Sequence, residues 1–138
     1  MNKSFLLSVL LALNVQATTI ELFVDQPVTL PPNFTVKVHD LSAPERLAQQ
    51  YLPKLPPDPE QAKQLAIKFL ASNKGREYQS LLKEAHQHKT YLMRYNIQKI
   101  PAIVFDEGVA VIYGSTDIEK GLEIYREFLK KSEATNEK

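Results

Sequence analysis

The chain has 138 residues, 43% hydrophobic and 24% charged, so it can bury a core as a single domain and is neither disordered nor fibrous. Its formal net charge of +1 leaves no basic surplus that would indicate a nucleic-acid partner. Cysteine is absent, which excludes disulfides, a thiol nucleophile, thiolate metal ligands and a lipid-modified N-terminal cysteine.

Residues 1–17 have the organisation of a signal peptide. Lys3 supplies a positive start, residues 5–13 are apolar, and Val15-Gln16-Ala17 is typical of a cleavage site. The apolar run is well short of the ~20 residues that a membrane-spanning helix needs. We therefore expect export to the periplasm, cleavage after Ala17, and a mature domain of residues 18–138 without a membrane span.

The mature chain is predicted to begin with two strands. Residues 19–24 alternate and contain strand formers, and residues 34–40 alternate between apolar and polar side chains. In the second strand Val36 and Val38 should face one side of a sheet, and Lys37 and His39 the other. Residues 25–33 between the strands contain three prolines and no helical period, which predicts a loop.

Three helices are predicted in the middle of the chain. A short one follows a capping box at 42–45, and a proline-rich connector at 52–57 ends it. Asp58 is expected to cap the second helix, and a break at 73–75 to separate it from a third that runs toward residue 95.

The C-terminal part is predicted to be a hairpin followed by a helix. Strands at 101–106 and 109–113 are joined by an acidic turn that contains Gly108, and a capping box at 116–119 starts a helix that runs to about 131. A frayed tail is expected from about 132. A proline, two strands and a helix in this order are how a thioredoxin-like domain ends, and there the proline, here Pro101, is cis. The fold class is therefore predicted as α/β and thioredoxin-like, a four-stranded mixed sheet in the order β-β-α-α-α-β-β-α, with the first two strands parallel.

Residue types that carry chemistry are present, but their spacing does not favour catalysis. His86 and His88 lie two residues apart, which places them on different faces of a helix. His39 and Asp40 are neighbours on a strand and should face opposite sides. Glu84 and His88 are expected to form an ordinary exposed i,i+4 pair on a helix surface. Since no nucleophile elbow or glycine-rich phosphate loop occurs either, we expect no enzyme, no cofactor and no metal site.

Four segments carry a resemblance to a known family: residues 41–47, 55–62, 97–106 and 111–117. They resemble the small exported proteins of integrating conjugative elements, which belong to the type IV secretion apparatus of genomic islands and are thioredoxin-like. They are also similar to TrbC-type pilin-assembly proteins. The chain departs from the family pattern at Asn96, where glycine is expected, and at Gln98, where threonine is expected.

The resemblance implies a role in conjugation. It favours a periplasmic, non-enzymatic assembly or scaffold component whose partners are other apparatus proteins, with pilin as one candidate. The alternative is a chaperone-like module that holds extended peptides by strand addition beside Pro101. Such binding would use Ile100 and Pro101, flanked by Asp25 and Gln26. Asp25 and Gln26 stand roughly where a redox thioredoxin has its cysteine pair. The helix that follows the cysteine pair in a redox thioredoxin is expected to be absent or reduced here. Partner identity and oligomeric state are left open.

Overall fold

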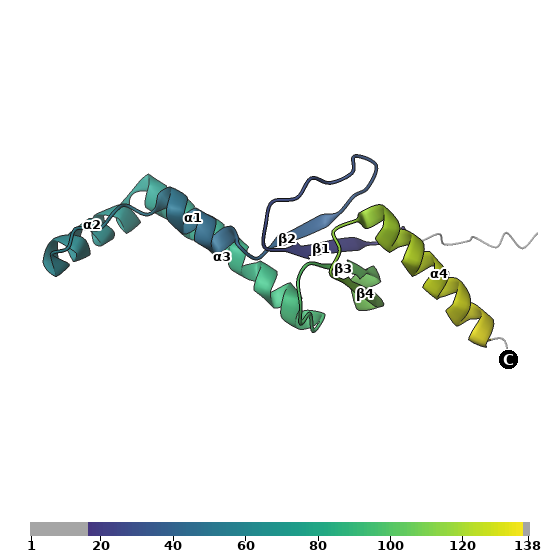
Figure 1. Cartoon of the computed structure of the whole chain (residues 1–138). Helices are drawn as coiled ribbons and strands as arrows, with labels where there is room; N and C mark the ends of the chain where they lie inside the picture. Colours follow the sequence, from purple (N-terminus) through teal and green to yellow (C-terminus); the bar gives the residue numbers. More distant parts are fainter. Residues whose placement is uncertain (1–16, 137–138) are drawn as a thin grey trace, which may run out of the picture.

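The computed structural model describes residues 17–136, so the predicted signal peptide lies almost wholly outside the described residues (Figure 1). Among the described residues, no helix combines the length and apolar character needed to cross a membrane. In chain order the elements are β1 (Ile20–Val24), β2 (Lys37–Asp40), α1 (Ala43–Tyr51), α2 (Pro59–Ala71), α3 (Asn73–Arg94), β3 (Ala102–Phe105), the 3-10 turn η1 (Asp106–Gly108), β4 (Ala110–Tyr113) and α4 (Ile118–Asn136).

The strands form one mixed sheet in the order β2-β1-β3-β4. β1 is parallel to β2 and antiparallel to β3, and β3 is antiparallel to β4. The α/β class, the four-stranded mixed sheet and the parallel first pair are therefore confirmed. This order and these directions agree with the thioredoxin-like topology that the sequence predicts.

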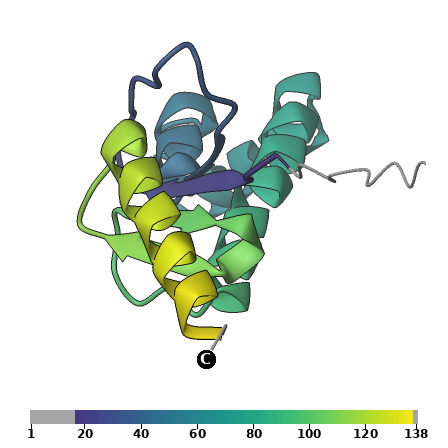
Figure 2. The same cartoon turned by 90° about the vertical axis from the view of Figure 1, so that its right-hand side faces the viewer.

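The two faces of the sheet are covered by different helices (Figure 2). On one face, α4 packs Ile118, Leu122 and Tyr125 against Leu22 and Phe105 of the sheet. The 25–36 loop joins this face without forming a helix, since Val28, Leu30, Phe34 and Val36 pack against the same core. These loop side chains occupy the position in the chain where a thioredoxin-like domain has its first helix.

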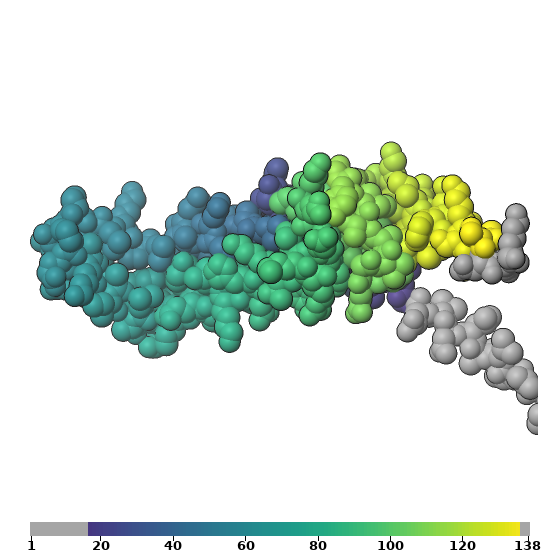
Figure 3. Space-filling view, turned by 90° about the horizontal axis from the view of Figure 1, so that it is seen from below, coloured from purple at the N-terminus to yellow at the C-terminus, as the bar shows by residue number. Residues whose placement is uncertain are grey.

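The opposite face is covered by the C-terminal end of α3. Phe23 and Val104 of the sheet pack there with Tyr91, Leu92 and Tyr95. At 22 residues, α3 is about 33 Å long, and only its last turns reach the sheet. Its remaining part projects away from the sheet and carries α1 and α2, so that the molecule is elongated (Figures 1 and 3). We call α1, the connector of residues 52–58, α2 and α3 the helical arm, and the remainder the sheet body.

Some predicted helix boundaries are wrong in detail. Ser42 precedes α1 but makes no side-chain cap, because its hydroxyl and its amide both donate to Asp40 Oδ1 instead. Asp58 caps α2 as predicted, accepting from the amide of Gln61 at 2.8 Å. The cap of α4 is Asp117, which accepts from the amide of Lys120 at 3.0 Å. α4 continues to Asn136, beyond the predicted frayed start at 132, because no helix-breaking residue follows.

The corner between α2 and α3 depends on a glycine. Ser72 ends α2 and caps α3, so the break falls one residue before the predicted 73–75. Gly75 is buried in the first turn of α3, and a Cβ there would lie 2.0 Å from the carbonyl oxygen of Phe69. A larger residue at this position would therefore force the two helices apart.

Candidate functional site

The four residues predicted to bind peptide lie at one end of the sheet. β1 and β3 are antiparallel with Phe23 opposite Ala102, so Asp25, which follows β1, and Ile100, which precedes β3, lie at the same end of the sheet. Asp25 and Gln26 are exposed, whereas Ile100 and Pro101 are half-buried. The Ile100–Pro101 peptide bond is cis.

A second group of side chains, which the sequence did not predict as a site, lies under α3. Glu21 of β1 accepts from His39 of β2 at 2.6 Å through one carboxylate oxygen, and from the hydroxyl of Tyr95 at 2.5 Å through the other. The second ring nitrogen of His39, Nδ1, lies 3.1 Å from Nδ1 of His88 on α3. We call these four side chains the histidine cluster: Glu21, His39, His88 and Tyr95. The cluster links β1, β2 and α3.

Hydrogen-bond geometry decides where the protons lie. Glu21 is ionised and can only accept, so His39 Nε2 carries the hydrogen that it receives. With His39 neutral, its Nδ1 has a lone pair and accepts from the N–H at Nδ1 of His88. This leaves Nε2 of His88 free of the cluster, as an acceptor when the ring is neutral or a donor when it is protonated.

Burial and neighbouring groups set the protonation states. Burial alone would raise the pKa of Glu21, but hydrogen bonds from Tyr95 and His39 outweigh it, and the pKa lies below its ordinary value. Burial lowers the pKa of His39, which is fully buried, against the opposing effect of Glu21. Burial, with the hydrogen bond to Glu21, raises the pKa of Tyr95 to about 12. The cluster at neutral pH is therefore a carboxylate, a neutral imidazole and a neutral phenol.

Aromatic rings enclose the cluster. The imidazole of His39 stacks on Phe23, with the ring centroids 4.4 Å apart, and lies 4.7 Å from the ring of Tyr91. The ammonium of Lys37 lies 3.7 Å from the centroid of Tyr91 and 3.8 Å from Glu21. No buried side-chain nitrogen or oxygen among the described residues lacks a partner, so this polar group is compatible with a stable core.

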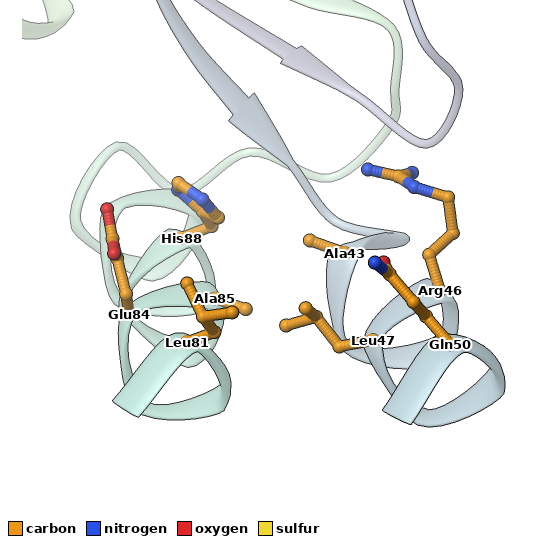
Figure 4. Close-up of a pocket in the computed structure, with 8 residues that line it drawn as sticks. All are labelled: Ala43, Arg46, Leu47, Gln50, Leu81, Glu84, Ala85 and His88. Atoms are coloured by element: carbon orange, nitrogen blue, oxygen red, sulfur yellow. The ribbon is translucent and has the colours of Figure 1, made fainter. Parts of the chain in front are cut away.

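His88 connects the cluster to a groove between α1 and α3, shown in Figure 4. The groove has a volume of about 300 Å³. Apolar side chains from the two helices face each other across it, with Arg46 and Gln50 on the α1 side and Glu84 and His88 on the α3 side. Arg46 is held in place by Asp40 and by the hydroxyl of Ser42. The lining residues are Ala43, Arg46, Leu47, Gln50, Leu81, Glu84, Ala85 and His88.

The arrangement fixes the helical arm to the sheet body. His39 and Glu21 are buried, and the ring of His88 contacts His39 from α3. Within residues 17–136 there is no group of three or more histidine, cysteine, aspartate or glutamate side chains that would hold a metal ion. The geometry therefore supports an attachment of α3 to the sheet, in which Nε2 of His88 takes no part in the hydrogen bonds of the histidine cluster.

Sequence reasoning missed the histidine cluster for a clear reason. His39 and His88 are 49 residues apart, and nothing in the spacing of either one indicates the other. The alternation of β2 correctly placed Lys37 and His39 on one face, but the prediction for His88 as a surface residue was wrong, because its ring is half-buried against His39. The one available signal of a buried histidine was His39 itself, which alternates with valines along the predicted second strand.

Fold and site together define a small α/β protein in which a four-stranded mixed sheet carries a long helical arm. The profile of the family described as "Protein of unknown function (DUF1525)" matches residues 17–131, and the chain belongs to this family. No curated protein and no solved structure gives a significant match.

Proposed function

We propose that this protein is a non-enzymatic assembly or scaffold component of a conjugative type IV secretion system encoded by an integrating conjugative element. The four segments that resemble exported proteins of such elements support the genetic setting. The signal peptide expected at residues 1–17 supports a periplasmic location. Its partners are other proteins of the apparatus, with pilin as one candidate.

The observation that carries the scaffold role is the exposed apolar surface of the helical arm. Neither α1 nor α2 contains a buried residue. Exposed apolar surface that is grouped, and not scattered, typically marks a protein-binding site. Three large apolar side chains of the arm line one hollow and are about half exposed, namely Leu52 (46%), Leu55 (55%) and Leu70 (46%).

A chaperone-like peptide-binding role is the second candidate. It is supported by the antiparallel pairing of β1 with β3, which brings the end of β1 and the start of β3, and with them Asp25 and Ile100, to one end of the sheet. Peptide held there would use backbone groups beside Ile100, with Asp25 and Gln26 providing side-chain contacts. The two roles differ in which region of the molecule a partner touches.

The test combines genetics with cross-linking. Deleting the gene from a conjugating strain should lower transfer frequency, and the wild-type gene should restore it. Cross-linking of the tagged mature protein, followed by mass spectrometry, should identify a protein encoded by the same element. Unchanged transfer after deletion would contradict the proposal.

Two sets of variants separate the roles. In the scaffold role, Leu55→Ser with Leu70→Ser should abolish rescue, while Asp25→Ala with Gln26→Ala should rescue fully. The peptide-binding role predicts the opposite result. All four positions are exposed, so each variant is expected to fold.

A further inference from the structure

β4 forms one edge of the sheet, and its outer side is uncovered. Within residues 17–136, β3 is the one strand that pairs with β4. In Figure 3, where the molecule is seen from below, the light-green segment that contains β4 lies at the surface between the end of α3 and α4. The peptide groups on the outer side of β4 are therefore open to a further strand.

Backbone hydrogen bonds show which residues of β4 present these outer groups. The amide of Gly114, one residue past β4, donates at 2.8 Å to the carbonyl of Pro101, one residue before β3. Bonded and non-bonded pairs alternate along an antiparallel ladder, so Ile112 is bonded to β3, whereas Val111 and Tyr113 are not. The amides and carbonyls of Val111 and Tyr113 therefore point to the outer side.

The ladder between β1 and β3 has the complementary phase. The amide of Asp106, one residue past β3, donates at 3.0 Å to the carbonyl of Thr19, one residue before β1. By the same alternation, the peptide groups of Ile103 point toward β4. Ile103 is the residue that lies opposite Ile112, so the two ladders agree on which groups of β4 face outward.

The two edges of the sheet differ in charge. β2, at the other edge, carries Lys37 and Asp40, and charged side chains discourage the addition of a strand. Residues 108–116 around β4 have no charge, and the side chains of Val109 (58%) and Tyr113 (46%) are about half exposed. β4 thus lacks the charged residues and prolines that protect the edges of many sheets.

The helix beside this edge is apolar on the same side. Gly121, Ile124 and Phe128 share one side of α4 by their helical spacing. A Cβ at Gly121 would lie 3.0 Å from Ile103 and 3.7 Å from Ile112, so this side is turned toward β3 and β4. Ile124 is 48% and Phe128 47% exposed, and Figure 2 shows the end of α4 running past β4. The opposite side of α4 carries charged residues: Glu119, Arg126 and Lys130.

We propose that β4 pairs in antiparallel orientation with β4 of a second copy of this chain, so that the two four-stranded sheets form one continuous sheet. The two-fold axis of such a pair is perpendicular to the sheet and keeps both α4 helices on the same face. Centred on Ile112, the pairing places Val111 of one copy opposite Tyr113 of the other and uses all of their outer peptide groups. The proposal is independent of the proposed function.

The apolar side of α4 favours a second copy over an extended segment of another protein. The net gain from a few peptide hydrogen bonds is small compared with the freedom lost on association, so a strand alone would bind weakly. A second copy also brings its own α4, and the symmetry turns Ile124 and Phe128 toward their counterparts. Because residues 108–116 are uncharged, the symmetric contact between the strands brings no like charges together.

Hydrogen exchange tests the pairing residue by residue. The exchange of the purified mature protein is followed by NMR at low and high protein concentration, and sedimentation equilibrium at the same concentrations should show a monomer converting to a dimer. The amides of Val111 and Tyr113 should exchange rapidly in the monomer and slow several-fold in the dimer. The amide of Ile112, which is bonded to β3, should be protected at both concentrations.

Lysine variants locate the interface. Val109→Lys with Tyr113→Lys puts charges at the edge and should raise the dissociation constant of the dimer at least about tenfold. Ile124→Lys with Phe128→Lys should raise it by a similar factor, because α4 supplies the apolar part of the contact. Ile67→Lys is the matched control, since Ile67 is 59% exposed on α2 in the helical arm, and it should leave the dissociation constant unchanged.

A protein that stays monomeric at the highest concentration used for NMR would overturn the inference. So would a dimer that both lysine variants leave intact, or one in which Val111 and Tyr113 exchange as in the monomer, because the interface would then lie elsewhere. Binding of a synthetic peptide of residues 108–116 to a protein that does not dimerise would assign the edge to a strand of another protein. Gene deletion tests the proposed function and sedimentation tests the dimer, so either can fail without the other.

Discussion

The sheet body and the helical arm differ in how their side chains are packed. The body holds nearly all of the fully buried apolar residues, including Phe23, Leu22, Ile103 and Phe105. The arm contributes only Gly75, Tyr78 and Ala85 to the buried set, all from α3. The comparison indicates that the body provides stability. The arm is attached to the body through the C-terminal end of α3, and it leaves its apolar surface available to a partner.

The largest difference should appear when one phenylalanine is removed from each region. Phe105 is fully buried and stacks on Tyr125 with centroids 4.7 Å apart, so Phe105→Ala should lower the free energy of unfolding by about 3–5 kcal/mol. Phe69 in the arm is only half-buried, and Phe69→Ala should cost less than half as much. Urea denaturation followed by circular dichroism measures both. Equal losses would show that arm and body share one core.

The histidine cluster should be the next most sensitive feature. Glu21→Leu removes the acceptor of both His39 and Tyr95, and leaving buried donors unpaired should destabilise the protein by about 3 kcal/mol. Glu84→Leu is the control, because Glu84 is an exposed carboxylate of α3, and it should change stability by less than about 0.5 kcal/mol. If the two variants are equally stable, the cluster does not hold the arm to the body.

A smaller and local effect is expected at the α2–α3 corner. Gly75→Ala places a Cβ against the Phe69 carbonyl, and the overpacking should cost about 1–3 kcal/mol. Hydrogen exchange should show faster exchange in α2 and the first turns of α3, with protection in β1 and β3 unchanged. Ser80→Ala, at an exposed position of α3, should leave exchange as in the wild type. Faster exchange throughout the sheet would mean that the two regions unfold together.

The smallest effect is a dependence of stability on pH that arises in the body. The pKa of folded His39 is lowered, so the unfolded chain binds more protons below about pH 6.5. Stability should therefore fall as the pH drops from about 6.5 to 5. The charged or titratable groups that face this imidazole are Glu21, Lys37 and His88.

Histidine variants test whether His39 causes this pH dependence of stability. In His39→Gln the loss of stability between about pH 6.5 and 5 should be much smaller than in the wild type, as measured by urea denaturation at each pH. His86 is exposed on the same helix as His88, and His86→Gln should behave as the wild type. A wild-type profile that is flat in this range would exclude a lowered pKa for His39.

The amino-acid sequence by itself determined the secondary structure and the class of the sheet. Alternation in residues 19–24 and 34–40 predicted two strands, although the second begins only at Lys37, because Phe34 and Val36 pack as part of the preceding loop. Asp58 and Pro59 predicted the start of α2, and the acidic stretch up to Gly108 predicted the turn before β4. These signals are local, because each depends on backbone preferences or on side chains a few residues apart. For the same reason the element order was correct throughout.

Only the tertiary structure decided what the elements bring together. The pairing of His39 with His88, the burial of Glu21 and the hollow between Leu52 and Leu70 all join residues that are distant in the sequence. Leu70 belongs to the apolar side of α2 by its helical spacing from Ala66, yet it is 46% exposed. A periodic pattern shows which side of a helix is apolar, but whether that side is covered depends on what the fold places beside it.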